Sequence, residues 1–446
     1  MILLAVLALL ILAALGAPLF ALIGAVALLG FHAAGQDGIA VAVEFYRLAD
    51  MPALIAIPLF TLAGYLLAES QAPQRLVRVT NALLGWLPGG LAIVAVLACA
   101  MFTAFTGATG VTIVALGAVL YPALLQQKYG EKFSLGLLTA SGSLGLILVP
   151  SMPLILYGVV AQQFHTTPPV TIDALFRAGV LPCALMVVLL SIYSLRHARR
   201  VGVVRERTGR GELLAAVKGA AWELPLPFVI LAGIYSGKLA ASEAAAATAL
   251  YVAIVTVVIR REIPLAKLPR VAREAMVLVG ALLVILGFSL ALTNWLIDAE
   301  VPEKLFNAIQ DSITSKGMFL LVLNAFLLVF GMLREGFPAI IILVPLVLPV
   351  ALKFGVDPIH LGIVVLANLQ LGIFLPPVGM NLFIASMRFG KPVLTLVRAS
   401  APFFLILLAR TRVSTGLPKR MLAMNRFMPT GGRKMPSCRL ARNTMP

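Results

Sequence analysis

The chain alternates apolar runs with short polar loops, and most of the runs suit helices that cross a membrane. A crossing takes about 20 residues, because a helix rises about 1.5 Å per residue through a hydrocarbon core about 30 Å thick. Two runs, Leu91 to Met101 and Val111 to Leu125, are too short for this and flank a Thr/Gly-rich turn. Lipid cannot satisfy free backbone groups at helix ends, so such a turn must lie against protein or in a wet cavity. The pattern predicts a re-entrant helical hairpin over about 90–126.

A second interruption follows this hairpin, where Pro150 and Pro153 stand inside the apolar run Gly145 to Leu154. We expect a broken transmembrane helix over about 134–160, with free backbone dipoles near the membrane midplane. Secondary transporters build ion and substrate sites from such dipoles. The alternative is that Gly and Pro only kink two ordinary membrane helices, in which both residues are common.

The second half of the chain repeats this order. An amphipathic segment at 302–310 echoes the one at 73–81, and it precedes a predicted hairpin over about 318–352 and a predicted broken helix over about 359–387. In one register of 227 positions the matched pairs are Pro122 with Pro349, Gly145 with Gly372, Leu148 with Leu375, Pro150 with Pro377, and Ser141 with Asn368. The pattern therefore predicts two structural repeats.

The distribution of charge predicts opposite orientations for the two repeats. Arg75 and Arg78 make the first interfacial arm basic, whereas the second arm is bracketed by Asp298, Glu300, Glu303 and Asp311. Basic loops stay on the cytoplasmic side, so the repeats are expected to be inverted and the acidic segment 32–50 to be an outside loop. The predicted parts are a first inverted repeat at 1–195, a basic cytoplasmic linker at 196–218, a connecting transmembrane hairpin with a basic loop at 219–273, a second inverted repeat at 274–409 and an atypical basic tail at 410–446.

Composition narrows the class of protein. The 446 residues are 61% hydrophobic and 12% charged, with a mean hydropathy of +1.02, so we expect an all-α polytopic protein in a lipid bilayer. The net charge of +17 lies largely in short loops, where it sets orientation and does not indicate nucleic-acid binding. Three cysteines and four scattered histidines indicate no disulfide framework, metal cluster or cofactor. No nucleophile–base pair stands at membrane depth, so an intramembrane enzyme is not expected, and a purely structural subunit would not need two hairpins.

The motifs at these interruptions resemble the large membrane subunit of tripartite ATP-independent periplasmic (TRAP) transporters. The resemblance covers about residues 1–408 and rests on FTGATG at 105–110, SGSLGLILVPSMPLILYG at 141–158, GMLREGFPAIIILVPLVLPVA at 331–351 and DPIHLGIVVLANLQLGIFLPPVGMNLF at 357–383. It implies a multi-pass, elevator-type carrier in the bacterial inner membrane, driven by a sodium gradient. It also implies a small four-helix membrane subunit, a periplasmic substrate-binding protein, and organic-acid cargo of the C4-dicarboxylate, 2-oxo-acid or sugar-acid type. The alternative is a self-sufficient anion symporter, coupled to protons or sodium, without a soluble partner.

Within this resemblance, sodium would be held by carbonyl groups freed at the interruptions and by side-chain oxygens beside them. The side-chain candidates are Thr106, Thr109 and Ser141 for one site and Glu335, Asn368 and Asn381 for its mate, with Gly336, Gly372 and Pro376 as backbone candidates. Half-helix N-termini present positive dipole ends to a carboxylate, so the cargo candidates are Thr106, Gly107, Ser143, Pro150, Ser151 and Gly379. Each hydroxyl has an alternative in a bond to the carbonyl four residues earlier, and Glu335 has one in pairing with Arg334.

The chain departs from the family pattern in two places. Val149 precedes Pro150 where the family usually has two prolines, which alters the tip but keeps the helix break. From Arg410 onward nine basic residues and no acid follow, where the family continues its last apolar helix. We interpret this tail as a departure of the reading frame near Ala409 or as an artefact of annotation or truncation.

Overall fold

The structure, a computed structural model, describes residues 17–85, 87, 89–164, 166, 169–203, 210–313, 315–333 and 336–416, with single positions at 7, 9, 11, 12 and 15. The chain divides into a large unit, Met1–Thr415, and a C-terminal unit, Gly416–Pro446. Every regular element in the described part of the large unit is a helix, which confirms the all-α class. The helical stretches there that are long and apolar enough to cross a membrane are Thr109–Gln126, Ile172–Val201, Ala241–Ile259, Leu265–Asp298, Lys316–Leu333 and Gly336–Lys353.

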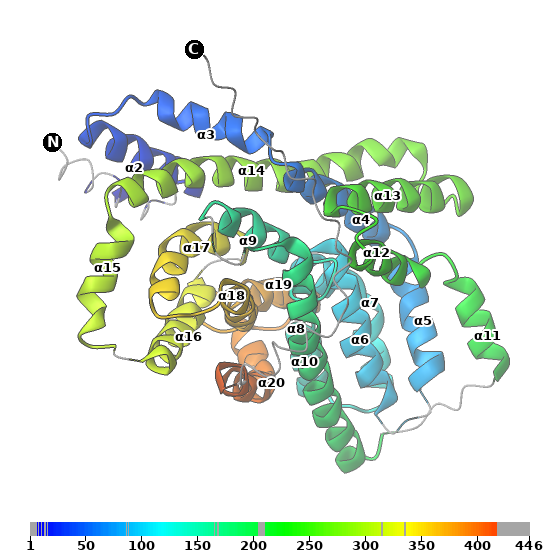
Figure 1. The fold of residues 1–446 in the computed structure, drawn as a ribbon. Helices are drawn as coiled ribbons and strands as arrows, with labels where there is room; N and C mark the ends of the chain where they lie inside the picture. The colour runs from blue at the N-terminus through cyan, green and yellow to red at the C-terminus, as the bar shows by residue number, and fades with distance from the viewer. Residues whose placement is uncertain are drawn as a thin grey trace. The chain divides into compact units, whose positions relative to one another are not determined.

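The long helix α14, Leu268–Asp298, organises one layer of this unit (Figure 1). Helices α2 (Leu19–Ala33) and α3 (Ile39–Ala49) pack on it, and so does α4 (Ala56–Glu69), which also packs on α13 (Ala241–Ala253) beside α12 (Pro225–Tyr235). Glycines allow the close approach, because a Cβ added at Gly30 would lie 2.4 Å from the Trp295 ring of α14. We refer to these six helices as the α14 layer.

Helix α3 corrects the prediction that segment 32–50 is a loop. Val41 and Leu48 are buried on one face of α3. Phe45 meets Phe288 of α14 edge to face, with ring centroids 4.9 Å apart. The prediction weighed the acidic charge of the segment and missed the apolar spacing at 41, 45 and 48, which is typical of one face of a helix.

Outside the α14 layer, the same succession of five helices occurs twice along the chain. The first series is α5 (Ala72–Leu84), α6 (Gly90–Thr106), α7 (Thr109–Gln126), α8 (Glu131–Ser141) and α9 (Met152–Gln162); the second is α15 (Val301–Gln310), α16 (Lys316–Leu333), α17 (Gly336–Lys353), α18 (Pro358–Gly372) and α19 (Met380–Phe389). Helices α7 and α17 begin 227 positions apart, and so do α8 and α18. Each interruption, at 142–151 and 373–379, contains a cis peptide bond, Val149–Pro150 and Pro376–Pro377.

The paired helices α6 and α7 are longer than the hydrophobic pattern predicted. Helix α6 has 17 residues and α7 has 18, so their length alone does not exclude a full crossing. Thr and Gly residues between 102 and 110 extend helices that the prediction ended with the last apolar run. The turn between them is nevertheless enclosed by protein, since Thr106 and Gly107 are both buried.

The first arm, α5, is fixed to neighbouring loops by a buried ion cluster. Arg75 donates to the carboxylates of Glu223 and Glu262, and the Gln71 N–H donates to Glu262 at 2.9 Å. Burial opposes the ionisation of Glu262, but the hydrogen bonds from Arg75 and Gln71 outweigh it and hold the pKa of this carboxyl below its ordinary value. The second arm, α15, instead packs on α17, and its Phe306 lies 5.1 Å between ring centroids from Phe354, the residue after the end of α17.

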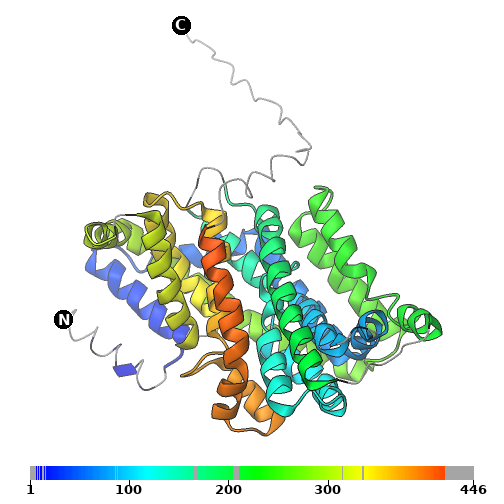
Figure 2. The same cartoon turned by 90° about the horizontal axis from the view of Figure 1, so that it is seen from below.

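Two further helices lie on the face of the large unit that Figure 2 shows. Helix α10, Ile172–Val201, and α20, Val393–Gly416, lie near each other there. Phe403 of α20 joins them, with ring centroids 5.1 Å from Tyr193 of α10 and 5.5 Å from Phe133 of α8. Helix α11, Arg210–Gly219, packs separately on α5.

Candidate functional site

The tips of both helix pairs and both interrupted helices meet at a small cavity of about 20 Å³. This volume holds about one water molecule. Its lining comes from four places in the sequence: Gly107 and Thr109; Leu146 and Pro153; Gly336, Phe337 and Ile340; and Leu366, Leu369, Gln370 and Ile373. The predicted residues Gly107, Thr109 and Gly336 therefore share one cavity, although 227 positions separate Thr109 from Gly336.

Hydrogen bonds connect the first tip to α19 and α8. Thr109 at the start of α7 donates to Oδ1 of Asn381 at the start of α19, over 2.6 Å. Asn381 in turn donates from Nδ2 to the Thr139 carbonyl at 3.5 Å. The structure thus pairs Thr109 and Asn381, which the sequence analysis assigned to different sodium sites. Thr106 makes the alternative bond considered for each hydroxyl, to the Phe102 carbonyl at 3.1 Å.

Ser141 and Asn368 present free oxygens at matching positions of α8 and α18. The Ser141 side chain is 0% exposed and Asn368 is 1% exposed. Asn368 Oδ1 has no hydrogen-bond partner, and the only group that interacts with Ser141 Oγ among the described residues is the thiol of Cys99, a weak donor that leaves lone pairs of the oxygen open. Asn368 Nδ2 donates to Asn324 of α16 and to the Val364 carbonyl. Buried polar atoms are normally satisfied, so these two oxygens are available to a ligand that accepts lone pairs.

The predicted residues at the two interruptions make local hydrogen bonds, cap a helix or pack against the neighbouring helix pair. Ser143 donates to the Ala140 carbonyl at 3.1 Å, and Ser151 caps α9 by accepting from the Leu154 N–H at 3.3 Å. The Gly379 N–H donates to the Met332 carbonyl at the second tip, over 3.1 Å. Pro150 and Pro376 lie at the two cis bonds, and Gly372 packs directly on Gly331. Glu335 and Arg334 lie outside the described residues.

Sequence reasoning missed Gln370 as a lining residue. Its side chain is 0% exposed, its Oε1 has no partner, and its Nε2 lies 3.6 Å from Sδ of Met186. The register offered a signal, because Gln370 stands 227 positions after Ser143, a predicted cargo residue. Within the described residues, no three His, Cys, Asp or Glu side chains group as metal ligands, so this region offers neutral oxygens.

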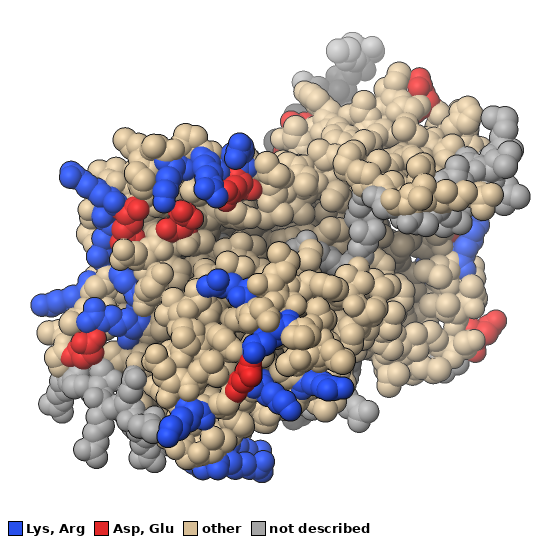
Figure 3. Space-filling model, turned by 180° about the vertical axis from the view of Figure 1, so that it is seen from behind, with Lys and Arg blue, Asp and Glu red and all other residues tan. Residues whose placement is uncertain are grey.

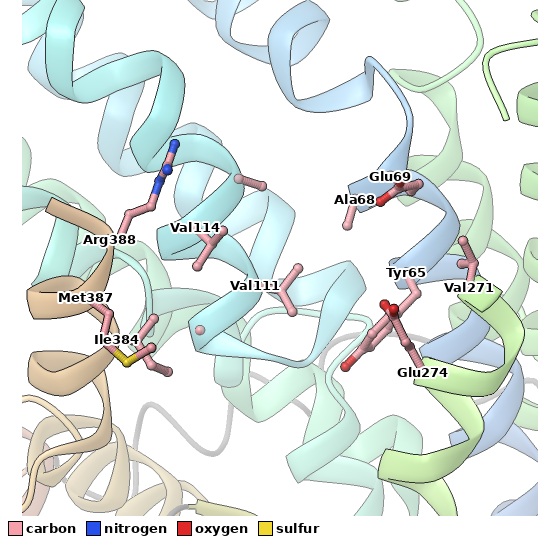
Figure 4. Close-up of a pocket in the computed structure, with 12 residues that line it drawn as sticks. Tyr65, Ala68, Glu69, Val111, Val114, Val271, Glu274, Ile384, Met387 and Arg388 are labelled. Atoms are coloured by element: carbon pink, nitrogen blue, oxygen red, sulfur yellow. The ribbon is translucent and has the colours of Figure 1, made fainter. Parts of the chain in front are cut away.

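A larger crevice of about 770 Å³ separates α7 and α19 from the α14 layer. Figure 4 shows Arg388 of α19 on one wall and Glu69 of α4 and Glu274 of α14 on the other. Both acids have basic neighbours on their own side, since Lys267 lies 3.9 Å from Glu69 and Arg270 lies 2.9 Å from Glu274. Figure 3 views the unit from behind, where Lys and Arg gather beside a hollowed part of the surface.

The crevice and the cavity are separated by the beginning of α7. Gly107 and Thr109 line the cavity, whereas Gly110 and Val111 line the crevice. The two spaces thus lie on either side of the first turn of α7, whose first residue, Thr109, is bonded to Asn381.

Comparisons with known proteins agree with this architecture. A sequence profile described as "Tripartite ATP-independent periplasmic transporter, DctM component" matches residues 3–418. The C4-dicarboxylate TRAP transporter large permease protein DctM of Pseudomonas aeruginosa is 32% identical over 389 residues, which cover 87% of this chain and 89% of that protein. The isethionate TRAP transporter permease protein DctMQ of Oleidesulfovibrio alaskensis is 32% identical over 90% of this chain and 63% of that protein.

A solved structure shares the fold. The YdaH transporter of Alcanivorax borkumensis matches 86% of this chain and 87% of that chain with a TM-score of 0.58. At 15% sequence identity this likeness concerns the fold alone. The profile match over nearly the whole chain identifies it as a member of the TRAP transporter large permease (DctM) family, and thus as a multi-pass membrane transport protein that is not an enzyme.

Proposed function

We propose that this chain carries organic-acid cargo across a bacterial inner membrane and is driven by a sodium gradient. Relatives are named for C4-dicarboxylates, isethionate, ectoine and sialic acid, each of which has an acidic group. The partners in a tripartite system are a small membrane subunit and a periplasmic substrate-binding protein. The matched part of this chain covers only 63% of DctMQ, so that relative has length for a second subunit in the same chain.

The pair of free oxygens on Ser141 and Asn368 is the observation on which the sodium assignment rests. Each lies one turn before a glycine, Gly145 or Gly372, that packs against the first helix of its pair. Sodium needs several oxygen ligands, and a helix interruption beside a hydroxyl or amide supplies carbonyl groups as well. Two equivalent places in two repeats support two coupling ions.

Alternating access follows if the two repeats are inverted in the membrane. Basic Arg75 and Arg78 on α5 and acidic Glu303 on α15 support arms on opposite sides. The cavity between the tips would hold cargo, and the crevice would connect it to the basic, cytoplasmic side. In this proposal, the helices of the two series move as an elevator past the α14 layer, and the first tip opens when the Thr109–Asn381 bond breaks.

The experiment is uptake into proteoliposomes that contain both membrane subunits, with the binding protein and a radiolabelled organic acid outside and graded external sodium. Ser141→Ala and Asn368→Leu should each weaken the apparent sodium affinity by about one to two decades, because loss of one ligand to a charged group costs about 1.5–3 kcal/mol. Ser134→Ala is the matched control, since Ser134 also lies on α8 and is buried but already donates to the Gly130 carbonyl at 2.9 Å.

Two results would contradict the sodium mechanism. The first is wild-type uptake that continues without a sodium gradient, which would favour a proton-coupled carrier. The second is sodium dependence of Ser141→Ala and Asn368→Leu that matches Ser134→Ala at equal protein levels. Uptake by the permease pair without the binding protein would instead favour a self-sufficient symporter.

A further inference from the structure

Gln370 is a buried amide with one end free. Its side chain is 0% exposed and its Oε1 lacks a partner. The nitrogen is the atom that faces Met186 Sδ at 3.6 Å, because an N–H group can donate to a thioether sulfur and a carbonyl oxygen cannot. The atom left without a partner beside the cavity is therefore a hydrogen-bond acceptor.

No described protein group donates to this oxygen, and the cavity that Gln370 lines has room for about one water molecule, so a hydrogen-bond donor that enters there can take the place of water at the oxygen. Ser143 stands at the corresponding position of the first series, and its hydroxyl group already donates a hydrogen bond to the Ala140 carbonyl at 3.1 Å. A glutamine at 370 is longer and lines the cavity. An acceptor that the protein itself leaves without a donor at a cavity is a place for a ligand that brings one.

Among the residues that line the cavity, Gln370 offers the main group that can distinguish one cargo molecule from another. Thr109 is the other polar side chain among the described lining residues, and its hydroxyl is engaged with Asn381 at 2.6 Å. The remaining side chains are apolar or absent. At about 20 Å³ the cavity has room for one small group, so the tips must part when a whole acid enters.

We propose that Gln370 determines specificity by accepting a hydrogen bond from the cargo. The cargo is then an organic acid that carries a hydroxyl or N–H group besides its acidic group. This inference rests on the proposed function and narrows its substrate class. A site built to accept a hydrogen bond discriminates against the analogue that lacks the donor, because the buried acceptor then stays unpaired.

The test measures the affinities of acids that differ by one hydroxyl for the full chain, purified with its membrane partner in lipid nanodiscs at saturating sodium. The probes are succinate with malate, propionate with lactate, and ethanesulfonate with isethionate. The hydroxylated member of a bound pair should bind roughly threefold to tenfold more tightly, the range of one net hydrogen bond. Gln370→Leu should abolish this preference by weakening the binding of the hydroxylated acid to that of its unhydroxylated partner.

Gln162→Leu is the control for exchanging glutamine in a helix, because Gln162 already donates to the Val170 carbonyl at 3.0 Å. It should keep the wild-type hydroxyl preference. Equal affinities within each pair, or a preference that survives in Gln370→Leu, would overturn the role of Gln370 and leave the proposed function intact. Failure of all six acids to bind would overturn this inference, because it predicts that a small hydroxylated acid binds, and would leave the organic-acid cargo to be tested by the uptake experiment above.

Discussion

Gly145 and Gly372 set the distance between each broken helix and its helix pair. A Cβ added at Gly145 would lie 2.3 Å from both the Ala100 carbonyl oxygen and the Ala104 nitrogen of α6. A Cβ added at Gly372 would lie 2.5 Å from the carbonyl carbon of Gly331 in α16. These neighbours are backbone atoms, so no rotamer change relieves the contact, and Gly145→Ala or Gly372→Ala must push a helix away.

The magnitude depends on how far the helix must move. A Cβ rarely approaches another heavy atom closer than about 3.4 Å, so α6 or the interruption must shift by about 1 Å in the Gly145→Ala variant. Overpacking of this kind costs about 1–3 kcal/mol. Gly280→Ala is the control, because Gly280 lies in α14 with nothing within 4 Å of an added Cβ; there alanine should stabilise the helix by up to about 1 kcal/mol.

The assay is thermal unfolding of each purified variant in detergent, followed by intrinsic fluorescence. Gly145→Ala and Gly372→Ala should both unfold below the wild type, and Gly280→Ala at or above it. In the uptake assay, the two destabilised variants should also need more sodium, since the free oxygens of Ser141 and Asn368 lie one turn away. Unfolding of Gly145→Ala at the temperature of Gly280→Ala would refute the packing argument.

Two further predictions concern topology and the ion cluster of the first arm. In a cysteine-free chain, Gln74→Cys should be shielded from an impermeant thiol reagent in intact cells while Glu303→Cys is labelled, and labelling of both from one side would exclude inverted repeats. Arg75→Ala should lower the free energy of unfolding by about 1.5–3 kcal/mol at pH 7, because it removes the charged hydrogen bonds to the carboxylates of Glu223 and Glu262, although Glu262 keeps its bond from the Gln71 N–H. The pKa of Glu262 is lowered in the native protein, so its contribution is complete above its unfolded pKa, about 4.3, and is lost as the pH falls through the native value; a penalty for Arg75→Ala that does not shrink in acid would contradict this account.

The apolar runs were sufficient to predict the all-α membrane class, and the positions of proline and glycine were sufficient to predict where the helices are interrupted. Proline and glycine change backbone geometry wherever they stand, so Pro150 and Pro377 mark interruptions without knowledge of neighbours. Helix ends were less predictable, because Thr and Gly between 102 and 110 continue α6 and α7 only where surrounding helices bury them. Helix α3 was missed for a related reason, since its apolar face is stabilised by contacts with α14 that lie more than 200 positions away in the sequence.

The location of the site could be predicted from the sequence better than the set of residues that form it. The tips and interruptions were predicted from local pattern, and the cavity lies among residues from both tips and both interruptions. The pairing of Thr109 with Asn381 depends on how the second series packs against the first, and no local pattern contains that information. Gln370 was passed over because a lone glutamine in an apolar helix has no motif of its own; its register match to Ser143 was the signal available in the sequence, and its free oxygen is visible only in the structure.

The arrangement of these groups gives the proposed coupling a physical basis. Thr109 joins the first tip to α19, and Asn381 joins α19 to the Thr139 carbonyl, two residues before Ser141 on α8. An ion that orders the end of α8 would therefore also hold Asn381 in place and favour the closed tip over bound cargo. By linkage, cargo must then raise the affinity for sodium by the same factor by which sodium raises the affinity for cargo. If the Thr109–Asn381 bond carries this coupling, Thr109→Val should reduce both factors equally while leaving the Ser141 oxygen free to bind its ion.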